Sequence, residues 1–170
     1  MPRGPRQLDG REVAQRLRAA MPDAVAGATD EWVEVAAPRV AEVLRWLHDD
    51  PALDAAQLSS LCSVDRYDRF ELVYHLQSLD QNHLIVVKAV LDREQPSLPS
   101  VYGVYRGALL QEREVYDLMG IHFEGHPDLR RLFLWEGFPG HPLRKNFLQI
   151  AGHHPGLPRF PFEEPGKQAR

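Results

Sequence analysis

Apolar residues recur at helical spacing in two stretches of the first fifty residues. The first stretch follows Asp9, a residue suited to cap a helix, and ends before Pro22. The second opens at Pro38 and ends before Pro51, because proline cannot continue a helix. Its apolar stripe consists of Val40, Val43, Leu44 and Leu47. The pattern therefore predicts two helices in this part of the chain.

Alternation with a period of two predicts five strands. Two short ones, over residues 24–28 and 32–36, lie between the two helices. Three longer ones follow over residues 58–64, 70–77 and 83–91. The last of them is apolar on both faces, which is typical of a central strand.

A third helix is predicted near residues 106–119, and Gly120 can end it in a left-handed conformation. The order is then α-β-β-α-β-β-β-α. This order favours an α+β two-layer sandwich, in which the helices pack on a mixed, largely antiparallel sheet. After the last helix, prolines are frequent and no further periodic segment follows, so we expect an extended, proline-rich C-terminal strap.

Length and composition indicate one domain with a tail. At 170 residues and 44% apolar content, the chain suits a single core. We expect an α+β domain over residues 1–119, with residues 1–8 flexible, and a strap and tail over residues 120–170. The net charge of −4 gives no overall basic footprint for nucleic acid. The single cysteine, Cys62, excludes a disulfide within the chain and favours a reducing compartment.

We expect neither a membrane span nor a secretory signal in this sequence. The apolar run over residues 84–87 stops at Lys88, far short of the roughly 20 residues that a spanning helix needs. The start of the chain lacks the apolar segment of a signal peptide. We therefore expect any membrane association to go through a partner.

The most unusual segment runs from residue 112 to residue 147. It contains two echoing motifs, His-Pro-Asp-Leu-Arg-Arg over residues 126–131 and His-Pro-Leu-Arg-Lys over residues 141–145. Each proline holds the preceding histidine in an extended conformation, so neither motif continues a helix. Each motif ends in two cations: Arg130 and Arg131 in the first, Arg144 and Lys145 in the second. A strap with paired basic residues is suited to holding another element or another protein.

Glu112 falls in the middle of the apolar arc of the third helix. A buried carboxylate must be paired, hydrogen-bonded or neutral, and Arg130, Arg131 and Arg144 are the candidate partners. This predicts that the strap folds back across the helix, with one basic pair on Glu112 and the other free for a partner. Arg113 and Asp117, four residues apart, are expected to form a surface pair.

Catalytic and metal sites find little support. His126, Asp128 and His141 could be read as the ligands of a free-standing metal hydrolase. However, Pro127 and Pro142, which follow the two histidines, prevent the arrangement on one face of a helix that strong ligand motifs require. Histidines that fix the strap through hydrogen bonds are the simpler interpretation. Cys62 lies on a predicted apolar strand and is expected to be a small buried hydrophobe. We expect no catalytic, cofactor-binding or metal-binding residue in this chain.

Aromatic residues and cations alternate near Phe133 and Trp135. With Arg130 and Arg131, this composition could stack single-stranded nucleic acid. The acidic net charge argues against that reading, and an aromatic anchor flanked by arginines is also typical of a protein interface. The residues that we expect to contact partners or fix the strap are Glu112, Arg113, His126, Arg130, Arg131, Phe133, Trp135, His141, Arg144 and Lys145.

The run ERE-V-Y-D-L-M-G-I-x-F-x-G-H-P-D-L-R-R, followed by G-H-P-L-R-K, closely resembles the signature of the C subunit, or 30 kDa subunit, of proton-pumping NADH-quinone oxidoreductase, respiratory complex I. Val64-Asp65, the FELVYHLQSL strand over residues 70–79 and residues 99–101 add to the likeness, which covers residues 58–147. Two departures stand in this region: Leu110 replaces a frequent aromatic residue, and Asn146 replaces a frequent aspartate.

The resemblance implies a cofactor-free structural subunit of the peripheral arm, on the cytoplasmic side of a bacterial membrane. Its implied partners are the quinone-site subunit and the subunit that carries the terminal iron-sulfur cluster, while FMN, iron-sulfur clusters and quinone belong to neighbouring subunits. The oxidoreductase activity, electron transfer from NADH to quinone, would belong to the assembly. The corresponding subunit of a membrane-bound hydrogenase or another donor dehydrogenase remains an alternative.

Overall fold

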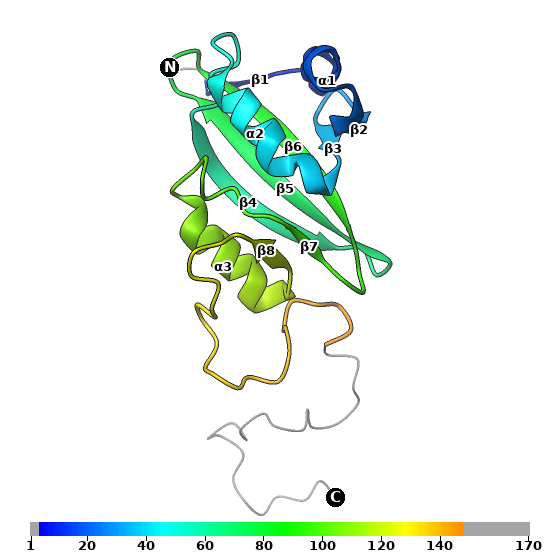
Figure 1. Cartoon of the computed structure of the whole chain (residues 1–170), viewed down its shortest axis with the longest axis vertical. Helices are drawn as coiled ribbons and strands as arrows, with labels where there is room; N and C mark the ends of the chain where they lie inside the picture. The colour runs from blue at the N-terminus through cyan, green and yellow to red at the C-terminus, as the bar shows by residue number, and fades with distance from the viewer. Residues whose placement is uncertain (1–3, 148–170) are drawn as a thin grey trace, which may run out of the picture.

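The computed structural model describes residues 4–147 and shows an α+β fold (Figure 1). Two helices precede the long strands and a third follows them, as the sequence predicts. The helices and short 3-10 turns are α1 (Gly10–Ala20), η1 (Pro22–Ala24), η2 (Ala37–Arg39), α2 (Val40–Asp49) and α3 (Ala108–Met119). The strands are β1 (Arg6–Gln7), β2 (Val25–Ala28), β3 (Val33–Val35), β4 (Gln57–Asp65), β5 (Arg69–Ser78), β6 (His83–Asp92), β7 (Ser97–Pro99) and β8 (His122–Glu124).

The main sheet has the strand order β2-β3-β6-β5-β4, with β1 paired to the start of β6. The pairs β4–β5, β5–β6 and β2–β3 are antiparallel, whereas β3 and β1 run parallel to β6. The expectation of a mixed, largely antiparallel sheet is confirmed. The central position of β6 is confirmed as well.

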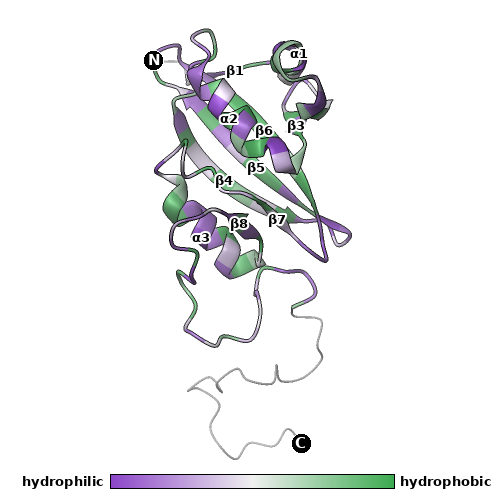
Figure 2. Ribbon diagram, viewed as in Figure 1, coloured by the Kyte–Doolittle hydropathy of each residue, from purple (hydrophilic) through white to green (hydrophobic). Residues whose placement is uncertain are grey.

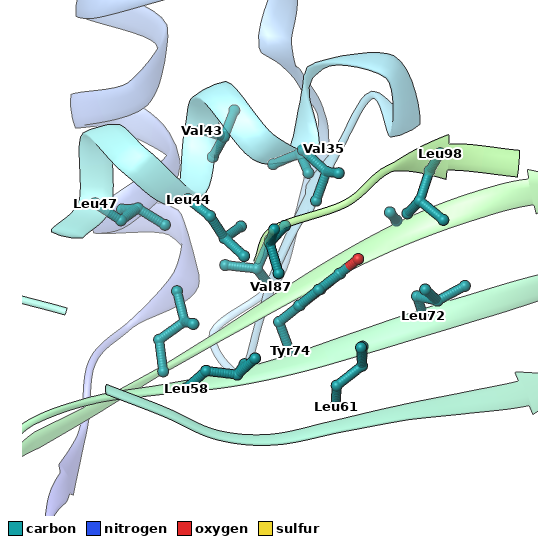
Figure 3. Close-up of a cluster of buried hydrophobic side chains, with 14 of the residues drawn as sticks. Val35, Val43, Leu44, Leu47, Leu58, Leu61, Leu72, Tyr74, Val87 and Leu98 are labelled. Atoms are coloured by element: carbon teal, nitrogen blue, oxygen red, sulfur yellow. The ribbon is translucent and has the colours of Figure 1, made fainter. Parts of the chain in front are cut away.

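The core lies between α1, α2 and one face of the sheet. Asp9 accepts a hydrogen bond from the Arg11 N–H at the start of α1, and the predicted stripe of α2 is buried. Figure 3 shows Leu44 and Leu47 of α2 facing Tyr74 of β5 and Val87 of β6. These contacts hold α2 on β5 and β6, and α3 packs against β4.

Three short strands escape sequence prediction. β1 has two residues, and β7 pairs with β8 in a separate two-stranded parallel sheet, so each is too brief for a periodic signal. Ile121 and Phe123, next to and within β8, belong to the apolar core. The core therefore extends past residue 119, where the expected domain ends; the division into a domain and a strap stays a prediction.

Beyond β8 the chain continues to residue 147 without a further helix or strand in the described part. From here on, the word strap means residues 125–147, the part of the expected strap that follows β8 and that the structure describes. Figure 2 shows the central strands largely in the colours of hydrophobic residues and the strap alternating between hydrophobic and hydrophilic ones. Within residues 4–147, no helix has the length and apolar character needed to cross a bilayer.

Candidate partner interface

Asp117 of α3 holds the middle of the strap. Its buried carboxylate accepts three consecutive backbone N–H groups at Oδ2, from Leu132 (2.9 Å), Phe133 (2.7 Å) and Leu134 (3.0 Å). Arg131 Nη1 donates to Oδ1 at 2.9 Å. Burial alone would raise the pKa of Asp117, but these donors hold it below the usual value. The charge on Asp117 therefore fixes the path of residues 131–134.

Arg131 ties this segment to the next one. Its guanidinium donates to the carbonyl oxygens of Phe138 (3.1 Å) and Gly140 (3.1 and 3.2 Å), in addition to its ion pair with Asp117. The Phe138 side chain is buried and stands edge-on to Trp135, with 4.7 Å between ring centroids. A planar five-donor group suits such a node, because it can bond several acceptors at once.

The second His-Pro motif caps the C-terminal end of α3. Arg144 Nε donates to the Met119 carbonyl at 2.7 Å, His141 Nδ1 donates to the Asp117 carbonyl at 2.9 Å, and the Leu143 N–H donates to the Leu118 carbonyl. These carbonyls lack partners within the helix, and a cation is favourable at this end. Burial lowers the pKa of His141, so its imidazole is neutral at neutral pH.

Gly120 makes this approach possible. It has φ of +70°, and an added Cβ would lie 2.5 Å from the His141 ring and 2.6 Å from Arg144. The left-handed cap that the sequence predicts at Gly120 is confirmed. The lack of a side chain there lets the strap return directly under the helix end.

The end of the strap is attached to the main sheet by Asp65, a residue that sequence reasoning missed. Arg93 binds its carboxylate through two nitrogens, at 2.5 and 3.1 Å, and the Lys145 and Tyr67 N–H groups donate to it at 3.0 and 2.8 Å. Burial opposes ionisation, but these donors lower the pKa of Asp65 to about 2. The sequence indicates that Asp65 follows a strand, but it does not indicate its partners, because Arg93 and Lys145 are distant in sequence.

Glu112 is fully buried, as its place on the helical wheel predicts, but its partners are not arginines. Ser100 Oγ donates to it at 2.5 Å and the Val101 N–H at 2.7 Å, while His126 Nε2 lies 3.8 Å away. Burial raises the pKa of Glu112 from 4.5 to about 7, against the effect of these hydrogen bonds. The expectation of a guanidinium on Glu112 is wrong, because Arg131 and Arg144 bond to the C-terminal half of α3 and Arg130 pairs with Asp128.

The buried environment of Glu112 includes a second polar group. The Tyr74 hydroxyl of β5 is buried and has no hydrogen-bond partner among the described residues. Burial, and then the charge of Glu112, raise the pKa of Tyr74 well above its usual value. Glu112 is thus the one buried carboxyl on this helix that no cation neutralises within residues 4–147.

Arg113 and His126 fix the start of the strap. Arg113 does not pair with Asp117, contrary to expectation; it donates to the Arg130 and Arg131 carbonyls and lies 3.5 Å from Asp128. His126 donates from Nε2 to the Leu109 carbonyl and accepts the Asp128 N–H at Nδ1. Both imidazole nitrogens are therefore engaged by backbone, which leaves neither free for a metal.

The strap leaves large apolar side chains on the surface. Phe133 is 64% exposed, Trp135 50% and Leu143 59%, and Leu110 of α3 is exposed as well. Beside them, a cleft of about 420 Å³ is lined by Tyr116, Leu129, Arg130, Arg131, Leu134, Glu136 and Gly137. Arg130 forms an exposed pair with Asp128, and the Lys145 ammonium lies 4.2 Å from the Tyr67 ring centroid. Exposed aromatic residues beside arginines are typical of protein interfaces.

Other candidate sites receive no support from the described residues. No group of three or more His, Cys, Asp or Glu side chains within residues 4–147 could hold a metal ion, and His153 and His154 lie outside the described residues. Cys62 is exposed, which corrects the expectation of a buried thiol, because it points away from the helices. Partial desolvation raises the pKa of its thiol, which disfavours a reactive thiolate.

A model of the family "Respiratory-chain NADH dehydrogenase, 30 Kd subunit" matches residues 33–152. The C subunit of NADH-quinone oxidoreductase from Roseiflexus sp. (strain RS-1) is 45% identical over 146 residues, which cover 82% of this chain and 84% of that protein. The C 2 subunit of NADH-quinone oxidoreductase from Rhizobium meliloti (strain 1021) is 46% identical over 130 residues, covering 75% and 70%.

Two solved structures resemble this fold. A trypsin-resistant fragment (1–134) of Nqo5 has a TM-score of 0.55 and 32% identity, and the match covers 70% of this chain and 98% of the fragment. A chain of the archaeal membrane-bound sulfane sulfur reductase, a respiratory membrane complex, has a TM-score of 0.66 at 24% identity, covering 83% and 86%. The second likeness shows a shared fold alone.

Proposed function

This chain belongs to the family of the 30 kDa subunit of respiratory-chain NADH dehydrogenases, whose relatives here are C subunits of NADH-quinone oxidoreductase, and we propose that its strap joins it to other subunits of that complex. The chain is a structural subunit of the peripheral arm of complex I. One observation carries the proposal for the strap: buried polar contacts hold it in a defined path, while Phe133, Trp135 and Leu143 stay exposed.

The geometry supports a role in assembly. Among the expected contact residues, Glu112, Arg113, His126, Arg131, His141 and Arg144 bond within the chain and order α3 and the strap. Phe133 and Trp135 are left to contact a partner. Ordering the strap before binding lowers the entropy that association must overcome. In this proposal the quinone-site subunit and the subunit with the terminal iron-sulfur cluster are the partners.

The chemistry of the complex is proposed to lie in other subunits. FMN, the iron-sulfur clusters and quinone would be bound by neighbours, and this chain would contribute no catalytic residue. Its place would be on the cytoplasmic side of a bacterial membrane, held there by its partners. No observation favours the hydrogenase, metal-hydrolase or RNA-binding alternatives.

Co-purification from the native host tests the proposal. A tagged chain, taken from gently solubilised membranes, is expected to bring iron-sulfur subunits and NADH-quinone activity with it. The double variant Phe133→Ser/Trp135→Ser is expected to lose them. Leu79→Ser, a matched change of an exposed apolar residue between β5 and β6, is expected to retain them. Recovery of the unmodified chain as a monomer, or full retention by the double variant, would contradict the proposal.

A further inference from the structure

The sheet has a second face that no helix of the described chain covers. Strand pairing places Cys62, Val73 and Lys88 in one row across this face, and Ser60, His75 and Val86 in the next. We call this surface the open face. Its apolar members are Cys62, Val64, Val73, Leu84, Val86 and Val90.

The partial exposure of three of these residues, all on β6, conflicts with the sequence pattern. β6 is apolar on both faces and its core-side residues are buried, but Leu84, Val86 and Val90 are only partly buried on the open face, whereas Val73 beside them on β5 is buried. Strands with two apolar faces are typical of sheets covered by a layer on each side. The described chain supplies one such layer, so the pattern indicates a second layer from elsewhere.

A polar atom on the same face is also unsatisfied. His75 Nδ1 is shielded from solvent and has no hydrogen-bond partner among the described residues. Shielded polar atoms without partners are rare in proteins and indicate a missing group. Rotation of the imidazole would present a nitrogen to a group that packs above Val86 and Ser60.

One end of the open face carries charge. A cleft of about 440 Å³ is lined by Trp32, Glu34, Arg66, Arg69, Glu71, Lys88 and Val90, so three cations face two carboxylates there. Glu71 is held by Arg66 and Arg69, each at 3.2 Å. The Lys88 ammonium lies 4.3 Å from the Trp32 ring centroid and forms no ion pair within residues 4–147. Arg69 also pairs with Asp68 at 2.8 Å, so Lys88 is the cation of this cleft that is left to pair with one more carboxylate.

We propose that the open face binds a segment of a partner subunit that carries an aliphatic surface and a carboxylate. Its aliphatic surface packs on Val73, Leu84, Val86 and Val90, and a carboxylate at one end enters the cleft beside Lys88. The inference rests on the proposed function and adds to it a second contact, made by none of the strap residues. The chain then joins two partners, one at the strap and one at the open face.

Cys62 provides a direct probe, because it is exposed on the open face and is the only cysteine of the chain. A small maleimide is applied to the isolated folded chain and to the tag-purified complex at the same pH. We expect labelling of Cys62 to slow at least tenfold in the complex. The control, Cys62→Ser/Arg16→Cys, places the thiol on the exposed side of α1 and reports general access of the reagent.

Equal labelling of Cys62 in the two states would overturn the proposal. Slow labelling of Cys62 in the isolated chain, together with dimers in sedimentation, would also overturn the proposal, because a second copy of the chain would then cover the open face. Lys88→Glu is expected to reduce recovery of one partner at least tenfold, whereas Lys88→Arg retains it; equal recovery with both variants would contradict the carboxylate contact. If the unmodified chain recovers no subunits at all, the proposed function itself fails.

Discussion

The sheet with its first two helices and the module of α3 and strap are held together by different forces. In the first region, apolar side chains such as Leu44, Tyr74 and Val87 pack in a continuous core. In the second, α3 adds Ala108, Val115 and Met119 to that core, but the strap is held by buried carboxylates and arginines that bond to backbone groups. The first region buries the apolar face of the sheet that the helices cover, whereas the strap leaves the large apolar residues Phe133 and Trp135 exposed.

The difference shows how an extended segment can keep one conformation without a core of its own. Apolar burial is non-directional and needs many contacts, which a single strap cannot supply. Hydrogen bonds to a buried charge are directional and stronger than neutral ones. Asp117 therefore orders residues 132–134 while leaving the Phe133 side chain exposed.

Asp117→Ala should have the largest effect on this contrast. It leaves three N–H groups and the Arg131 guanidinium without their acceptor, which should cost about 4 kcal/mol, as expected when one partner of a buried pair is removed. The free energy of unfolding is measured by urea titration. The matched control is Asp128→Ala. The Asp128 carboxylate is partly exposed, so its loss should lower the free energy of unfolding by less than about 1 kcal/mol. Equal effects would refute the central role of Asp117.

Glu112→Gln should change the dependence of stability on pH. The folded pKa of about 7 lies above the usual 4.5, so the folded state binds this proton more tightly. Protonated Glu112 therefore stabilises the folded state relative to the ionised form. This contribution to the free energy of unfolding is complete below about pH 4.5 and is lost as the pH rises through 7, and it amounts to at most about 3 kcal/mol. The variant should match the parent near pH 4.5 and be more stable at pH 8. A constant difference across this range would contradict the raised pKa.

Gly120→Ala should destabilise the chain by about 2 kcal/mol, since it combines a strained backbone with displacement of His141 and Arg144. Gly125→Ala isolates the backbone cost, because φ is +77° there and nothing lies within 4 Å of the added Cβ. It should cost about 1 kcal/mol. Thermal unfolding of both variants measures the difference, and equal shifts would mean that the strap does not approach Gly120 closely.

Phe133→Ser should have the smallest effect on the isolated chain, within about 0.5 kcal/mol, because the side chain is largely exposed. The same variant combined with Trp135→Ser is expected to lose its partners. Calorimetry of the isolated chain separates the two effects. A large loss of stability would place Phe133 in the fold and not in the interface.

The sequence predicts the first region well, because periodicity reports burial. The stripe of α2, the cap at Asp9 and the long strands follow from local patterns. The brief β7 and β8 do not, since three residues carry no period. Cys62 was expected to be buried because its strand is apolar, but the helices cover only the other face of that strand.

In the second region, the sequence identifies the groups but not their pairing. Glu112 is buried, as its helical position predicts, yet Ser100 and Val101 satisfy it while the arginines bond near Asp117 and Met119. Several carboxylates and cations stand within the same short stretch of chain, and the path of an irregular strap decides which of them meet. No local rule fixes that path, because it depends on glycine conformations and prolines together.

The most direct test is hydrogen exchange at the amides of Leu132, Phe133 and Leu134 in the isolated chain. If buried polar contacts order the strap before any partner binds, these amides should exchange on the order of a hundredfold more slowly than in an unfolded chain, and Asp117→Ala should remove the protection. Exchange at unfolded rates in the unmodified, isolated chain would contradict a strap ordered in advance.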